Sequence, residues 1–153
     1  LSGLVGSEMC IRDSPESEDL IITGIVDEAD KWDVVGDALV SISPSAMESF
    51  SLVVLEAWVK SVPTLVNATC GPTVENCSLS GGGLWFDSYA SFEVLLGRLL
   101  DDDGLRRELG ERGRAFVERT FDWPVLIRRY EAFLEGVIAR GRHMPPPMRA
   151  ERP

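Results

Sequence analysis

Short apolar runs alternate with longer amphipathic stretches along the chain. Runs of three to five apolar residues indicate strands, and apolar residues spaced three or four apart indicate helices. The predicted strands cover residues 19–26, 38–42, 64–67 and 84–86. The predicted helices cover residues 29–35, 52–60, 89–100, 105–119 and 123–138. A loop rich in Gly, Pro, Asn, Cys and Ser is expected between the third strand and Gly82. This alternation predicts an α/β fold with a Rossmann-like parallel sheet flanked by helices.

The helix predicted over residues 52–60 has apolar residues on every side, which is typical of a buried helix. Glu56 interrupts this pattern. An unpaired buried carboxylate costs several kcal/mol, so Glu56 needs hydrogen-bond donors. Hydroxyl groups of a ligand are one source of donors. A buried arginine or a cluster of backbone amides is the other, and would give Glu56 a purely structural role.

Glu48 lies between the strand predicted over residues 38–42 and that helix, after Pro44. In parallel α/β sheets, ligands bind at strand-to-helix turns beyond the carboxyl ends of the strands. Ser49 and Ser51 are candidate N-caps, and the free N–H groups at the start of the helix favour an anion such as phosphate. The turn therefore predicts a ligand site, with an exposed Glu48 that binds nothing as the alternative.

The residues from Pro44 to Val66, with Glu48 and Glu56 eight positions apart, resemble the signature of the retaining glycosyltransferase family 4, of GT-B fold. The similarity continues in order through Gly82-Gly83-Leu84-Trp85-Phe86, Leu99-Leu100-Asp101-Asp102, Leu105-Arg106, Leu109-Gly110, Gly113-Arg114 and Phe121-Asp122-Trp123. It covers residues 20–134, as the partial C-terminal half of a GT-B enzyme.

The resemblance implies a role for each residue of the turn. Glu48 is the catalytic residue and contacts the donor sugar near its reacting carbon, and Glu56 binds the ribose hydroxyls. The backbone of residues 49–52 binds the diphosphate and the sugar, and the loop that holds Val26 lies near the nucleobase. The donor-binding residues are then Glu48, Ser49, Phe50, Ser51, Leu52, Glu56 and Val26. The resemblance implies a nucleotide-diphosphate-sugar donor, no further cofactor and no required metal.

Two positions depart from the family pattern. Family members carry glycine beside the phenylalanine, where this chain has Ser49 and Ser51, so the closest approach of the backbone to the sugar or phosphate is expected to differ. Ser61 replaces a glycine where the helix ends, at a position that often needs a left-handed backbone. We expect a small loss of stability from Ser61 without a loss of function.

We expect three segments along the chain. Residues 1–14 resemble a non-native end, residues 15–139 form a partial nucleotide-sugar-binding domain with its C-terminal helices, and residues 140–153 form a disordered tail. Family members carry an Arg and a Lys for the diphosphate and an N-terminal acceptor domain ahead of this region, and neither is found in these 153 residues. The expectation is therefore a fragment that is inactive when isolated.

One face of the last predicted helix has two possible partners. Its apolar residues are Val125, Ile127, Tyr130, Phe133 and Leu134. By resemblance, this face packs on the absent acceptor domain. The alternative is that it packs on the chain's own sheet.

Composition narrows the choice of partners and location. The net charge of −10 argues against nucleic acid, because phosphate backbones attract clustered Lys and Arg. No apolar run is long enough to span a membrane. The family resemblance implies a cytoplasmic protein, with peripheral membrane association through the absent domain left open. Cys70 and Cys77 are expected to stay reduced, and neither these cysteines nor His143 is expected to form a metal or catalytic site.

Two functions are compatible with these residues. The first is a glycosyltransferase fragment that moves a sugar from its nucleotide-diphosphate donor to an unknown acceptor, with retention of the anomeric configuration. The alternative is a non-catalytic Rossmann-like module that binds a nucleotide or phospho-ligand. A glycosidase-like acid and base pair is disfavoured, because hydrogen bonds would keep Glu56 ionised and unable to donate a proton.

Overall fold

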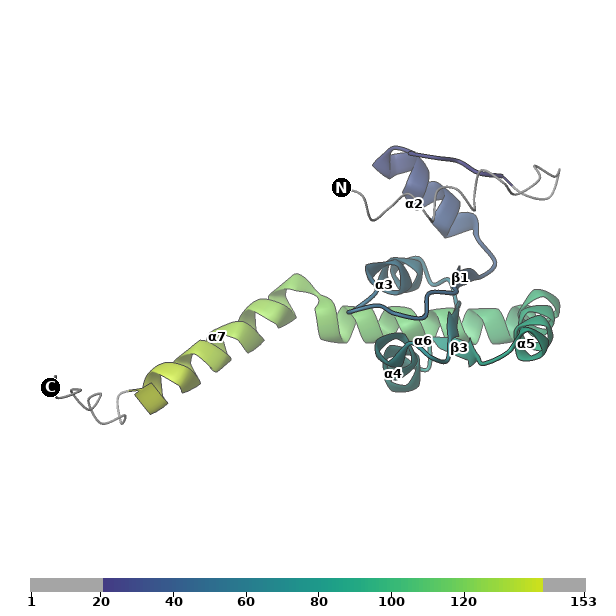
Figure 1. Ribbon diagram of the computed structural model, residues 1–153. Helices are drawn as coiled ribbons and strands as arrows, with labels where there is room; N and C mark the ends of the chain where they lie inside the picture. The colour runs from purple at the N-terminus through teal and green to yellow at the C-terminus, as the bar shows by residue number, and fades with distance from the viewer. Residues whose placement is uncertain (1–20, 142–153) are drawn as a thin grey trace, which may run out of the picture. The chain divides into compact units, whose positions relative to one another are not determined.

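The computed structural model describes residues 21–141, and the chain divides into two compact units, Leu1–Trp32 and Asp33–Pro153. Figure 1 shows the helices and strands of the described chain, most of them labelled. In chain order they are α2 (Glu28–Asp37), β1 (Ser41–Ser43), α3 (Leu52–Val59), β2 (Thr64–Asn67), α4 (Gly71–Ser80), β3 (Gly83–Phe86), α5 (Tyr89–Asp101), α6 (Asp103–Phe121) and α7 (Trp123–Gly141).

The described part of the first unit contains no strand. Residues 21–27 are irregular, so the strand predicted over residues 19–26 is wrong for its described part, and residues 19 and 20 lie outside the described residues. Ile21 and Ile25 are exposed. An apolar run becomes a strand only where a neighbouring strand pairs with its N–H and C=O groups. The predicted helix that follows is confirmed as α2.

The second unit is built on a three-stranded parallel sheet in the order β1-β2-β3. Ser41 pairs with Thr64, and Thr64 pairs with Gly83, so the three strands begin at the same edge. β1 is shorter than the strand predicted over residues 38–42, because pairing with β2 covers only residues 41–43. β2 has its predicted bounds, and β3 adds one residue at its start. The predicted parallel α/β sheet is confirmed in these strands.

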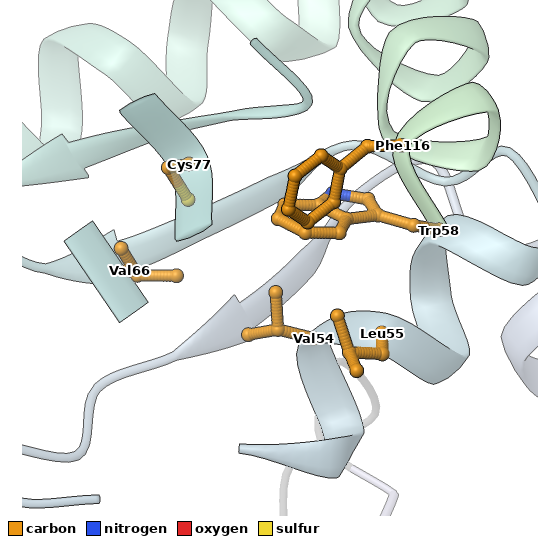
Figure 2. Packing of buried hydrophobic residues seen from close by; sticks show 6 residues of the cluster. All are labelled: Val54, Leu55, Trp58, Val66, Cys77 and Phe116. Atoms are coloured by element: carbon orange, nitrogen blue, oxygen red, sulfur yellow. The ribbon is translucent and has the colours of Figure 1, made fainter. Parts of the chain in front are cut away.

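The central strand β2 separates two apolar clusters, because successive side chains of a strand point to opposite faces. The first cluster, drawn in Figure 2, contains Val54, Leu55, Trp58, Val66, Cys77 and Phe116. The second contains Leu65 with Leu99 of α5 and Leu109 of α6. Both Leu65 and Val66 are fully buried. β2 is therefore covered on both faces, as is usual for a central parallel strand.

α4 occupies a segment that the sequence pattern predicted as a loop, so this prediction is wrong. The buried face of α4 carries Thr73, Asn76, Cys77 and Ser80, in place of the large apolar residues that indicate a helix. Neighbouring parallel strands need a crossover connection, which is usually a helix. Tertiary packing between β2 and β3 thus overrides a weak local signal.

Side chains cap the N-termini of α5 and α6. Ser88 and Ser91 form a capping box, in which the Ser91 N–H donates to the Ser88 Oγ at 3.2 Å and the Ser88 N–H donates to the Ser91 Oγ at 3.1 Å. At the start of α6, the Asp102 carboxylate accepts a hydrogen bond from the Leu105 N–H at 2.8 Å. Both predicted helices are confirmed, with slightly wider bounds.

α3 ends in a Schellman motif centred on Ser61. The Val62 N–H donates to the Ala57 carbonyl oxygen at 2.9 Å, and the Ser61 N–H donates to the Trp58 carbonyl oxygen at 2.9 Å. Ser61 has a φ of 59°, in the left-handed region that favours glycine. The expectation of a left-handed backbone at this position is therefore confirmed.

α7 contacts α6 and exposes most of its apolar residues. Four of the five residues on the face considered above are 40% to 65% exposed, namely Ile127, Tyr130, Phe133 and Leu134. The alternative in which these four pack on the chain's own sheet is therefore wrong. α7 includes residues 140 and 141, which were expected in the tail. Residues 142–153, with His143, and residues 1–14 lie outside the described residues.

Candidate functional site

Two strand-to-helix turns lie at the carboxyl edge of the sheet. Ser43 pairs with Val66, so β1 and β2 end beside each other, and residues 44–51 and 68–70 leave the sheet at that edge. Glu48 lies in the first turn and is half-buried. Ligands of parallel α/β folds bind at this edge. The strand-to-helix turn predicted around Glu48 is confirmed.

Glu56 lies on α3 and is half-buried. The prediction that α3 is buried on every side, with Glu56 inside a core, is wrong, because Leu52, Val53 and Val59 are 66%, 57% and 43% exposed. Residues three and four apart share a helix face, so Glu56 shares the exposed face with these three residues. A periodicity argument fails here because only one side of α3 is covered, by α6 and by strands β1 and β2. Glu56 is consequently accessible to a ligand.

The N-termini of α3 and α4 have no side-chain cap. Ser51 and Cys70 occupy the N-cap positions, but neither side chain accepts a hydrogen bond from its helix, and neither helix has an acidic residue in its first turn. The prediction that a serine side chain caps α3 is therefore wrong. α5 and α6, in contrast, are capped. Since the first N–H groups of a helix lack intrahelical acceptors, both turns at the carboxyl edge present donors to an anion.

Two asparagines that the sequence pattern did not reveal hold the first turn. The Asn67 Nδ2 donates to the Pro44 carbonyl oxygen at 3.0 Å, and the Asn67 Oδ1 accepts from the N–H and the Oγ1 of Thr69 at 2.9 and 2.8 Å. The Asn76 Nδ2 donates to the Phe50 carbonyl oxygen at 3.4 Å. A polar residue at the carboxyl end of a buried strand is a signal for Asn67. Asn76 lies on the unpredicted helix α4.

The possible metal ligands of the described chain include two cysteines, Cys70 and Cys77. Among residues 21–141, no group of three His, Cys, Asp or Glu side chains could hold a metal ion. Cys70 and Cys77 are buried and free, which confirms the predicted reduced pair. Burial raises the pKa of the Cys77 thiol to about 11, and its hydrogen bond with Thr64 opposes this effect. Cys77 therefore stays protonated near neutral pH and is a poor nucleophile.

Similarity to known proteins identifies the family. The model of the family "Glycosyl transferases group 1" matches residues 14–116. The chain belongs to this family. Its resemblance to glycosyltransferase family 4 is thereby confirmed.

No helix within residues 21–141 has the length and apolarity needed to cross a membrane.

Two proteins similar to this group 1 glycosyltransferase domain are both much longer than the matched region. A trehalose synthase of Rubrobacter xylanophilus is 34% identical over 89 residues, which are 58% of this chain and 21% of that protein. The structure of a sucrose-phosphate synthase from Thermosynechococcus elongatus aligns with a TM-score of 0.67 at 24% identity, over 78% of this chain and 30% of that chain. The likeness confirms the partial GT-B fold. The chain therefore spans less than a third of either relative.

Ser51, one of the two serines expected to stand in place of glycines, has a left-handed backbone in this glycosyltransferase domain. Ser51 has φ 62° and ψ 80°, whereas Ser49 is absent from the residues with positive φ. Among the described non-glycine residues, only Ser51 and Ser61 have a positive φ. Ser51 therefore has the left-handed backbone that favours glycine, Ser49 is an exposed residue of the turn, and the expected change in backbone approach to the donor stays a prediction.

The structure groups most of the predicted donor-binding residues. Glu48 and residues 49–52 lie in the turn and at the start of α3, and Glu56 follows on the same helix. Val26 belongs to the first unit, where it is 39% exposed. The contacts assigned to Glu48, Glu56, Val26 and the backbone of residues 49–52 stay predictions.

Proposed function

We propose that this domain binds the nucleotide-diphosphate-sugar donor of a retaining glycosyltransferase. The observation that carries the proposal is the turn at Glu48. It lies at the carboxyl edge of the sheet and leads into the uncapped N-terminus of α3, with Glu56 on the accessible face of the same helix. In this proposal the donor-binding domain comprises residues 15–139.

The diphosphate is placed at the start of α3. Backbone N–H groups of residues 49–52 donate to its oxygens, and the positive end of the helix dipole stabilises the negative charge that develops as the diphosphate leaves. Leu52, the first residue of α3, is 66% exposed, so a ligand can reach the start of the helix. Ser51 as a whole residue is 8% exposed, so the protein largely encloses it.

The two glutamates bind different parts of the donor. Glu48 contacts the sugar near its reacting carbon, where a carboxylate favours the positive charge of an oxocarbenium-like transition state. Glu56 accepts charge-assisted hydrogen bonds from the ribose hydroxyls. The turn between them spans the diphosphate. Val26 contributes main-chain contacts to the nucleobase.

Binding by the chain itself tests the ribose assignment. Isothermal titration of UDP-glucose, ADP-glucose and GDP-mannose identifies the nucleotide that binds. Glu56→Gln keeps an acceptor oxygen and loses the charge, so it is expected to weaken binding of that nucleotide by about 1–1.5 kcal/mol, which is roughly 5- to 10-fold. Glu111→Gln removes the same charge from an exposed position on α6 and is the matched control. Equal affinities of a folded Glu56→Gln variant and the control would contradict the assignment.

Transfer is measured on the complete gene product, because the chain spans less than a third of its relatives. Glu48→Gln is expected to abolish transfer and to leave nucleotide affinity within about threefold of wild type, since an amide keeps the shape of the side chain and removes its charge. We expect the isolated chain to bind donor without transferring sugar. Donor binding by the complete protein with neither transfer nor donor hydrolysis would instead support a non-catalytic nucleotide-binding module.

A further inference from the structure

The turn that carries Glu48 makes few hydrogen bonds of its own. Among residues 21–141, no backbone–backbone hydrogen bond outside the helices and strands involves residues 44–50. One internal bond runs from the Ser45 Oγ to the Met47 carbonyl oxygen at 3.1 Å. Fixing a residue's backbone in one conformation costs about 1–2 kcal/mol of entropy, so a turn of this kind needs support from its neighbours.

Side-chain amides from the region of β2 and α4 give that support. The Asn67 Nδ2 donates to the Pro44 carbonyl oxygen at 3.0 Å, where the turn begins. The buried Asn76 donates to the Phe50 carbonyl oxygen at 3.4 Å, where the turn ends. The Phe50 ring also packs edge-on against Phe121, with ring centroids 5.3 Å apart. The first and last residues of the turn are thus each tied to another element.

We infer that Asn67 is a positioning residue for the donor site, which fixes the turn presenting Glu48 through its hydrogen bond to Pro44. This inference rests on the proposed function of Glu48. The orientation of the Asn67 amide follows from its partners, because its oxygen accepts two hydrogen bonds from Thr69. The NH₂ group must then point toward the Pro44 carbonyl oxygen.

Asn67 couples two turns that are far apart in sequence but adjacent at the sheet edge. Pro44 belongs to the turn after β1, and Thr69 belongs to the turn after β2. Loss of the Pro44 bond lets the Glu48 carboxylate move relative to the N-terminus of α3. A displacement of about 1 Å at a reacting group can lower a rate by about 100-fold, so this contact affects turnover more than it affects folding.

The substitution Asn67→Asp tests the NH₂ group of the Asn67 side chain separately from its oxygen. The aspartate keeps an oxygen for the Thr69 bonds and places a second oxygen, in place of NH₂, against the Pro44 carbonyl. Thr69→Val is the matched control, because it removes the Thr69 Oγ1 bond and leaves the Asn67–Pro44 bond intact. If Asn67→Asp does not fold, Asn67→Ser is used, whose shorter side chain does not reach Pro44.

NMR relaxation and kinetics together test the inference. Backbone order parameters of about 0.85 mark a rigid backbone and values below about 0.6 a flexible one, and we expect Asn67→Asp to lower the order parameters of residues 45–50 toward the flexible range. In the complete gene product, kcat should fall by more than about tenfold, and the affinity for the free nucleoside diphosphate should stay within about threefold. Thr69→Val should leave the order parameters at their wild-type values and change kcat and affinity by less than about twofold.

Two results would overturn the role of Asn67. One is wild-type order parameters in residues 45–50 of a folded variant at position 67, and the other is lowered order parameters with unchanged kcat. A wild-type protein that binds none of the three nucleotide sugars would overturn the proposed function, and with it any role of Asn67 in transfer. In that case the order parameters still decide whether Asn67 orders the turn.

Discussion

The indole N–H of Trp58 donates a hydrogen bond to the carbonyl oxygen of Gly82, at 2.9 Å, inside the apolar cluster shown in Figure 2. Trp58 is fully buried, and its ring also contacts Phe116 edge-on, with centroids 5.9 Å apart. The bond joins α3 to the start of β3, so it links the helix that follows Glu48 to the far strand of the sheet.

Trp58→Phe should destabilise the domain. The substitution removes the shorter of two hydrogen bonds to the buried Gly82 carbonyl oxygen, which still accepts from the Thr64 N–H at 3.3 Å, and it removes part of a large side chain. We therefore expect a loss of about 1–3 kcal/mol in the free energy of unfolding. Urea unfolding followed by circular dichroism measures it. Trp123→Phe is the control, because Trp123 is 71% exposed and the change should lie within about 0.5 kcal/mol. Equal effects at the two positions would contradict the role of the Trp58 bond.

Gly113→Ala should also destabilise the domain, although alanine favours a helix. A Cβ at position 113 would lie 2.5 Å from the Trp58 Cγ, so overpacking of about 1–3 kcal/mol outweighs the gain in helix propensity. Gly97→Ala on α5 is the matched comparison, since its Cβ would meet no atom within 4 Å. That variant should gain about 0.5–1 kcal/mol. The thermal midpoints of the two variants should therefore shift in opposite directions.

Ser61→Gly should raise stability by about 0.5–1 kcal/mol. A left-handed backbone costs a non-glycine residue about 1–2 kcal/mol, and part of this gain is offset by the greater freedom of glycine in the unfolded chain. The Schellman hydrogen bonds are made by the backbone and persist in the variant. Ser78→Gly, at an exposed position within α4, should lower stability. A Ser61→Gly variant that is no more stable than wild type would refute the cost assigned to this backbone.

Stability should fall between about pH 9 and pH 11 because of Cys77. Its folded-state pKa of about 11 exceeds the ordinary value of 9.0, since burial disfavours the thiolate. The folded state therefore holds this proton more tightly than the unfolded state does. The associated stabilisation, about 2–3 kcal/mol, is complete below pH 9 and is lost as the pH rises through 11. Urea midpoints across this range should decline less steeply in Cys77→Ala than in wild type.

The parallel sheet could be predicted because its signals are local. β2 and β3 are apolar runs bounded by turn residues, and α5 and α6 have clear amphipathic periodicity and serine or aspartate caps. The strand predicted over residues 19–26 failed because a strand also requires a partner, which an apolar run does not specify. α4 was missed because its buried face is made of Thr, Asn, Cys and Ser, and such residues signal a helix only when packing encloses them.

Some features of the candidate site could likewise be predicted from the sequence, and others could not. The sequence by itself determined the order of Glu48, the serines and Glu56 along a strand-to-helix turn, and it determined the family, because these depend on residue type and spacing. Tertiary structure alone decided that Glu56 lies on an accessible face, because periodicity does not say which side of a helix with apolar residues all round packs against α6 and the sheet. It also decided that Asn67 holds Pro44, since the two residues are 23 positions apart in sequence and meet only where parallel strands end together.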